Sequence, residues 1–171
     1  MLITTPRSNA IVTLAVAAAV ATAVVCAQEN KPPAVPFPRD FRSWHHVKSI
    51  VIGPEHRSFA IRGGIHHYYA NDQAIEGYRT GTFPNGSMIV DEAVFTKDGE
   101  GQAKGITLEG DRRGLDVMVK NDRLFKASGG WGFDHFDRDN TTGMLPAADR
   151  TTCFECHAKA PRDHVYSSVR K

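Results

Sequence analysis

Apolar and polar residues alternate along several short segments in the middle of the chain, which is the pattern of strands in an antiparallel sheet. In the segment 114–120, three apolar residues alternate with Asp116, Met118 and Lys120, as expected of a strand with one buried face. Four other segments are rich in β-branched or aromatic residues and lie next to turn residues. These further predicted strands are residues 47–52, 65–69, 87–95 and 130–136.

Short helices are predicted between these strands. Asp40 is expected to cap a helix that runs through Phe41 to Trp44. Asn71 is expected to cap a second helix, which Gly81 would end. Together with a helix near the C-terminus, these segments predict a mainly β, α+β fold in which an antiparallel sheet carries a few short helices.

The N-terminal residues have the features of a secretory signal peptide. Arg7 precedes an uncharged run at 11–25, and small residues follow up to Ala27. We therefore expect residues 1–27 to be a signal peptide, 28–38 an extended leader rich in proline, and 39–171 a single periplasmic domain. Two alternatives stay open: a retained membrane anchor, or a lipid on Cys26, for which the preceding Val25 is poorly suited.

The net charge and the spacing of the cysteines limit the classes of function that this protein could have. The formal net charge is +2 and no block of one sign stands out, which argues against a nucleic-acid partner. Of three cysteines, one falls in the expected signal peptide, so only Cys153 and Cys156 would remain after export. Two cysteines this close together cannot build the disulfide framework common in exported proteins, which indicates another use of the thiols.

Cys153 and Cys156 stand in the sequence Cys-Phe-Glu-Cys-His, the attachment signature of haem c. Two thiols about one helical turn apart can each form a thioether bond to haem, and the imidazole of His157 would bind the iron. Thr152 and Glu155 have the spacing of a capping box, so the haem-binding helix is expected to begin at Cys153. The sequence thus predicts one covalently attached haem c, with Cys153 and Cys156 as cofactor-binding residues and His157 as the metal ligand.

The two thiols have three other possible uses. A thioredoxin-like redox motif follows a strand of a βαβ unit, which this motif does not. A zinc site would need two more ligands, for which the paired histidines at 45–46 and 66–67 are candidates. A disulfide across two intervening residues is strained and rare. The adjacent His157 and the export signal favour haem over all three.

The other side of the iron lacks an obvious protein ligand. Only fourteen residues follow His157 and none of them is methionine, the usual sixth ligand of small electron-transfer cytochromes. Met88, Met118 and Met144 are upstream candidates, although a methionine in a strand is more often part of the core. An open iron position that binds a small molecule is therefore the favoured interpretation.

Several segments together resemble the cytochrome P-460 family. The matching segments are residues 40–44, the tyrosine-rich strand 66–69, the turn 83–87, residues 117–121 and 130–133, and the C-terminal haem motif. The resemblance implies a β-rich domain that commonly forms dimers, with a five-coordinate haem and His157 as its proximal ligand. It also implies two activities: oxidation of hydroxylamine, and binding of nitric oxide in the cytochrome c'-beta branch.

Two positions depart from the hydroxylamine-oxidising members of that family. Those members carry a lysine cross-linked to the porphyrin where this sequence has Asp91, and they tend to carry arginine where it has His66. A carboxylate cannot form the amine-to-porphyrin bond. Asp91 and Glu92 would point to opposite faces of their strand, so one carboxylate would be buried unless the strand lies at a sheet edge. Asp91 and His66 are therefore candidate catalytic residues of the distal pocket.

Three functions remain open at this point. The favoured one is an exported haem protein that binds or slowly converts nitric oxide or a related small nitrogen species. The second is an enzyme that oxidises hydroxylamine or uses peroxide, in which Asp91 or His66 moves protons. The third is an electron carrier with a sixth ligand such as Met118. A homodimer is expected, and a cytochrome is a possible redox partner.

Overall fold

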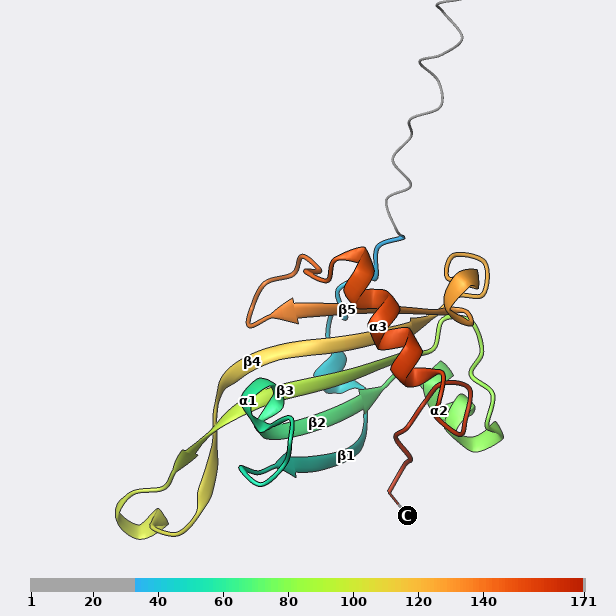
Figure 1. The fold of residues 1–171 in the computed structure, drawn as a ribbon. Helices are drawn as coiled ribbons and strands as arrows, with labels where there is room; N and C mark the ends of the chain where they lie inside the picture. Colours follow the sequence, from blue (N-terminus) through green and yellow to red (C-terminus); the bar gives the residue numbers. More distant parts are fainter. Residues whose placement is uncertain (1–32, 171) are drawn as a thin grey trace, which may run out of the picture. The chain divides into compact units, whose positions relative to one another are not determined.

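The computed structural model describes residues 33–170, which fold around one antiparallel sheet. The expected signal peptide and the first part of the leader lie outside these residues. The five strands are β1 (His45–Ile52), β2 (Gly64–Ala70), β3 (Met88–Asp98), β4 (Thr107–Lys120) and β5 (Trp131–Asp137). Their order in the sheet is β1-β2-β3-β4-β5, so each strand pairs with its neighbour in the sequence (Figure 1). The predicted mainly β, α+β fold is confirmed.

Three short α-helices accompany the sheet. They are α1 (Phe59–Arg62), α2 (Asp72–Thr80) and α3 (Ala147–His157), and α3 runs across the sheet beside β5 (Figure 1). Single 3-10 turns lie at Phe41–Ser43, Gly101–Ala103 and Lys126–Ser128. Within residues 33–170 the structure shows no helix that is long and apolar enough to span a membrane.

The predicted cap of α2 is confirmed. Asn71 Oδ1 accepts a hydrogen bond from the Ala74 amide at 3.0 Å, and Gly81 ends the helix in the left-handed conformation with φ 86°. The predicted cap at Asp40 is wrong, because its side chain makes no capping bond and its φ of 56° lies in the left-handed region. The helix that was expected to run to Trp44 is one 3-10 turn.

The expected start of the C-terminal helix is also wrong. Helix α3 begins at Ala147 rather than at Cys153, so the cysteine motif occupies its second half. Thr152, which was expected to form a capping box with Glu155, instead donates from Oγ1 to the Ala148 carbonyl oxygen at 3.3 Å inside the helix. The thiols are therefore carried by a helix that is already established before Cys153.

The sheet is buried on both faces. One core cluster includes Phe83, Ile89 and Trp131, and Cys153 of α3 packs against it. The second cluster, on the other face, includes Leu115 and Phe136. Because β3 is the central strand, the alternative that placed Asp91 and Glu92 on an exposed sheet edge is wrong. Both carboxylates are buried, which requires a partner for each.

Beyond the sheet, β3 and β4 continue as a two-stranded arm (Figure 1). Strand β4 starts at Thr107, well before the predicted start at residue 114, and its first residues pair with the end of β3 up to Asp98. The tip of the arm, residues 99–106, is a mostly exposed connection that contains one 3-10 turn. The part of β4 that follows Arg112 belongs to the five-stranded sheet.

Candidate functional site

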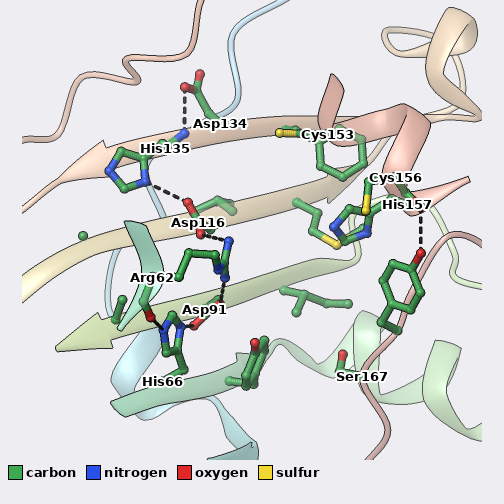
Figure 2. A pocket seen from close by; sticks show the side chains of 18 of the residues that line it. Arg62, His66, Asp91, Asp116, Asp134, His135, Cys153, Cys156, His157 and Ser167 are labelled. Atoms are coloured by element: carbon green, nitrogen blue, oxygen red, sulfur yellow. Dashed lines mark hydrogen bonds and ion pairs between the residues drawn. The ribbon is translucent and has the colours of Figure 1, made fainter. Parts of the chain in front are cut away.

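A cavity of about 930 Å³ lies on the sheet face that α3 crosses. This volume is near the upper end of the range of small-molecule and cofactor sites, about 300–1,000 Å³. Its walls come from all five strands, from α1, from α3 and from the segment 165–167 that follows the last helix. Figure 2 shows two groups of functional side chains in it, one on α3 and one along the sheet.

The three residues of the predicted haem motif line the cavity together. Cys153 is half-buried, Cys156 is more exposed, and both thiols are free. Burial, together with the charge of Asp116, raises the pKa of the Cys153 thiol. The disfavoured alternative of a disulfide is not what the structure shows, because both cysteines are free and both sulfur atoms are available for bonds to a cofactor.

The imidazole of His157 is held in one tautomer. Its Nδ1 donates to the carbonyl oxygen of His164 at 2.8 Å, and a carbonyl can only accept, so the proton is on Nδ1. The lone pair is then on Nε2, the nitrogen that can bind a metal. Burial lowers the pKa of His157, which favours the neutral ring. Phe133 packs against the ring with 5.0 Å between the centroids.

These side chains fit haem c better than they fit zinc. Two free thiols about one turn apart, followed by a neutral imidazole with a free lone pair, are the donors that haem c needs. Within the part of the chain that the structure describes, no three His, Cys, Asp or Glu side chains gather as metal ligands. His45 pairs with Asp72 at 2.8 Å, away from the cysteines.

A row of polar side chains faces the same cavity from four adjacent strands (Figure 2). The strand register places Tyr68 opposite Asp91, Asp91 opposite Asp116, and Asp116 opposite His135. The four residues therefore cross the sheet from β2 to β5 in a line. Directly opposed like charges destabilise a sheet, so the Asp91 and Asp116 pair needs compensation.

Arg62 supplies that compensation from the last position of α1. Its guanidinium donates to Asp91 Oδ2 at 2.7 Å and to Asp116 Oδ2 at 2.9 Å. Burial alone would raise the pKa of Asp116, but the hydrogen bond from His135 and the charge of Arg62 outweigh it and lower the pKa. One arginine thus neutralises the repulsion between two strands.

His66 is fully buried and uses both ring nitrogens. Nδ1 bonds Asp91 Oδ1 at 2.8 Å, and Nε2 donates to the Arg62 carbonyl oxygen at 2.7 Å. Because both partners accept hydrogen bonds, both nitrogens carry protons and His66 is an imidazolium. Burial opposes this charge, but the hydrogen bond and the charge of Asp91 raise the pKa. His66 therefore has no lone pair to offer to a metal.

His135 completes the row at β5. Its Nδ1 bonds Asp116 Oδ1 at 2.7 Å, and this hydrogen bond is the main reason that the pKa of His135 is raised. The charges of Arg62 and Asp116 also act on the pKa values of the Cys153 thiol and the His157 imidazole. The polar row and the cysteine motif therefore face one common space.

A family model for cytochrome P460 matches residues 38–167, which is most of the chain and includes both groups of side chains. The chain belongs to the cytochrome P460 family. This confirms the resemblance and makes the protein a mono-haem c-type cytochrome, with haem c and its iron as the cofactor. The comparison with curated protein sequences gave no significant match.

The cytochrome P460 fold brings together residues that the sequence indicated separately. Asp91 and His66, the two residues predicted for the distal pocket, are joined by a hydrogen bond, and both line the cavity. Sequence reasoning missed Arg62, Asp116 and His135. A signal existed for Asp116, since it is a carboxylate in a strand with strong apolar alternation, but its partners depend on strand register and on α1.

Glu92 confirms that neighbouring carboxylates on β3 point to opposite faces. It is 2% exposed, and it accepts hydrogen bonds from Arg42 at 2.6 Å and from Arg112 at 2.9 Å. None of these three residues lines the cavity. Glu92 therefore has a structural role on the far face, which makes it a suitable control for Asp91.

Proposed function

We propose that this cytochrome P460 family member binds nitric oxide or a related small nitrogen species at an open position of its haem iron. Thioether bonds from Cys153 and Cys156 would hold the haem, and Nε2 of His157 would bind the iron. The observation that carries this proposal is the tautomer of His157, because its Nδ1–H···O=C bond leaves Nε2 free beside two free thiols. Haem supplies the iron that binds the diatomic ligand.

The positions of the methionines support an open site. Met144 is 53% exposed and does not line the cavity, and Met88 packs against the core on the far face of the sheet. Met118 does line the cavity, but it pairs in the sheet with Phe133, whose ring packs on His157. Met118 therefore lies near the expected proximal ligand rather than in the polar row.

The polar row gives this cavity hydrogen-bond donors toward a bound ligand. Arg62 is a permanent cation at the cavity wall, and the raised pKa of His135 keeps a proton on that ring to higher pH. A donor near a bound nitrogen oxide stabilises the negative charge that the ligand gains from ferrous iron. Asp91 orients Arg62, and Asp116 orients both Arg62 and His135.

The same row favours a second candidate, an enzyme that oxidises hydroxylamine or uses peroxide. Such reactions move protons, and the pair of His135 with Asp116 can hold and release one. The lysine that relatives cross-link to the porphyrin is replaced by Asp91. Lys48 is the cavity-lining lysine among the described residues, and its Nζ lies 5.7 Å from the centre of the Tyr68 ring.

The ferrous absorption spectrum, with and without nitric oxide, tests the proposal on protein matured in a host that attaches haem. A high-spin c-type spectrum that changes on adding nitric oxide is the expected result. A Soret band at unusually long wavelength would instead identify the cross-linked enzyme. A low-spin spectrum unaffected by carbon monoxide would identify an electron carrier with a sixth ligand such as Met118.

We further propose that the protein is exported to the periplasm, forms a homodimer and exchanges electrons with a partner cytochrome. The family membership and the N-terminal sequence pattern support export. N-terminal sequencing of the mature protein should begin at Gln28, which would test the proposed boundary at residue 27. Light scattering would decide between a monomer and a dimer.

A further inference from the structure

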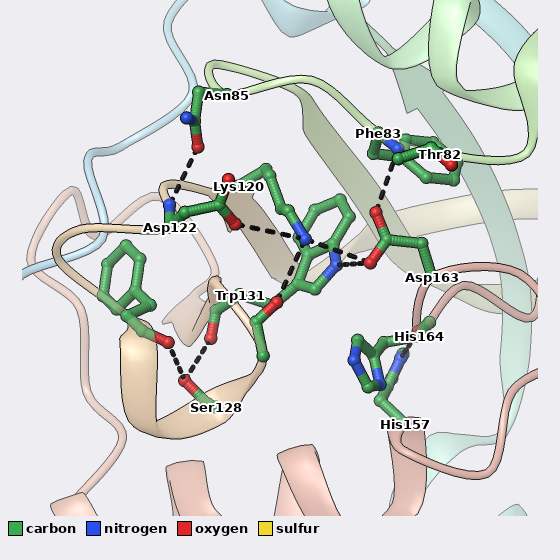
Figure 3. Close-up of polar contacts among 12 residues, drawn as sticks. Thr82, Phe83, Asn85, Lys120, Asp122, Ser128, Trp131, His157, Asp163 and His164 are labelled. Carbon is green, nitrogen blue, oxygen red and sulfur yellow. Dashed lines mark hydrogen bonds and ion pairs between the residues drawn. The ribbon is translucent and has the colours of Figure 1, made fainter.

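Lys120 and Asp163 form an ion pair on the same side of the fold as His157 and His164 (Figure 3). Lys120, the last residue of β4, is 6% exposed and donates from Nζ to Asp163 Oδ1 at 3.0 Å and to the Gly129 carbonyl oxygen at 3.0 Å. The ammonium group also lies 5.3 Å from the centre of the Trp131 ring. The lysine is thereby fixed by several contacts from different parts of the fold.

Asp163 connects Lys120 to the segment that follows α3. Besides the Lys120 bond, its Oδ2 accepts the Phe83 amide at 2.9 Å, and Oδ1 lies 3.4 Å from Trp131 Nε1. Asp163 and His164 both have left-handed backbone angles, with φ 41° and 66°. Residues other than glycine avoid this region unless surrounding contacts enforce it. The ion pair supplies such contacts on one side.

Val165 supplies such contacts on the C-terminal side of His164. Its side chain is 1% exposed in the core, and its amide donates to the Arg162 carbonyl oxygen at 2.8 Å. His164 is therefore held between two anchored neighbours. Its carbonyl oxygen is the group that accepts the Nδ1–H of His157.

We propose that Asp163, fixed by Lys120, is a positioning residue for His157. It sets the place of the His164 carbonyl, and this carbonyl sets the tautomer, the ring orientation and the basicity of the imidazole. The inference rests on the proposed role of His157 as the iron ligand. A stronger Nδ1–H bond gives the ring more imidazolate character, which strengthens the iron–histidine bond and favours ferric iron.

The test compares Asp163→Ala, Asp163→Asn and Lys120→Met in the haem-loaded protein. Resonance Raman spectroscopy of the ferrous form measures the iron–histidine stretching band, and a redox titration measures the reduction potential. We expect all three variants to move the band to lower frequency and the potential to more positive values. Glu92→Gln is the matched control, because it alters a buried, charge-paired carboxylate on the far face and should change neither quantity.

A His157→Gly variant separates this inference from the proposed function. If the band persists without the imidazole, His157 is not the iron ligand and both proposals fail. If the band is lost in His157→Gly but stays at the wild-type frequency in the Asp163 and Lys120 variants, the positioning role alone is overturned. A shift of equal size in Glu92→Gln would also overturn it, since general loss of stability would then explain the effect.

Discussion

Asp91 and Asp116 lie directly opposite each other on β3 and β4, and they share Arg62 as a partner. Two carboxylates at opposed sheet positions would repel each other, so the single turn of α1 that carries Arg62 is coupled to the stability of the sheet. This arrangement makes the wall of the cavity a charged network in which Arg62 lies between the two carboxylates.

Replacing Arg62 with Gln should lower the free energy of unfolding by about 1–2 kcal/mol, because two partly buried charge-assisted hydrogen bonds are lost. Urea unfolding of the haem-loaded protein measures the change. Adding Asp116→Asn removes one of the opposed charges. The double variant should therefore be more stable than the sum of the two single effects predicts. Strict additivity would show that Arg62 does not compensate the carboxylate pair.

The pair of His135 with Asp116 should stabilise the protein in a defined pH window. The His135 pKa is raised, so its contribution is complete below the ordinary histidine value of 6.5 and is lost as the pH rises through the raised value. The Asp116 pKa is lowered, so its contribution is complete above 3.8 and is lost as the pH falls through the lowered value. The stability difference between wild type and His135→Phe should be largest between pH 3.8 and 6.5. A difference that grows above this window would contradict the assignment.

Replacing Asp91 with Asn should change the pH dependence of nitric oxide binding. The variant removes the carboxylate that stabilises the His66 imidazolium, so the His66 pKa should fall and the cavity should lose a positive charge at lower pH than in the wild type. Stopped-flow association rates from pH 5 to 9 measure this effect. Rates identical to wild type at every pH would remove Asp91 from the distal pocket.

Replacing both Cys153 and Cys156 with Ser should abolish covalent haem attachment. Haem-dependent peroxidase staining after denaturing electrophoresis detects the bound cofactor, and the band should be lost in the double variant. Each single variant should retain haem through the remaining thioether bond. Covalent haem in the double variant would show that other residues of this chain hold the porphyrin.

Replacing Glu92 with Gln should separate stability from ligand chemistry. The free energy of unfolding should fall by about 1.5–3 kcal/mol, because Arg42 and Arg112 lose a charged acceptor. The ferrous spectrum and the nitric oxide association rates should stay at wild-type values, since Glu92 lies outside the cavity. Chemical unfolding and stopped-flow measurements on one sample check both statements.

The sheet was predictable because the sequence pattern within each short segment is enough to indicate a strand. Alternation in 114–120, and turn residues next to the other segments, required no knowledge of distant residues. The first part of β4 was missed because its residues are largely polar and exposed on the arm. Helix α1 was missed because it is one turn without a side-chain cap. The start of α3 was misplaced because α3 has no buried residue to give its first turns an apolar period.

The haem motif could be recognised from the sequence because all its donors lie within five consecutive residues. The polar row could not, since it depends on the register of four strands and on a turn that brings Arg62 across them. The hydrogen bond from His157 to the His164 carbonyl was equally hidden, because it needs two adjacent left-handed residues. Local spacing reveals the attachment chemistry, whereas the environment of the iron depends on tertiary structure.

The strands follow one another across the sheet in the order in which they occur in the chain, and the cysteine motif comes after the last of them. Pairing between sequence neighbours closes only short loops, so the sheet can assemble step by step from its N-terminal strand. All five strands that wall the cavity precede the thiols in the chain, so forming this wall requires no residue of the cysteine motif.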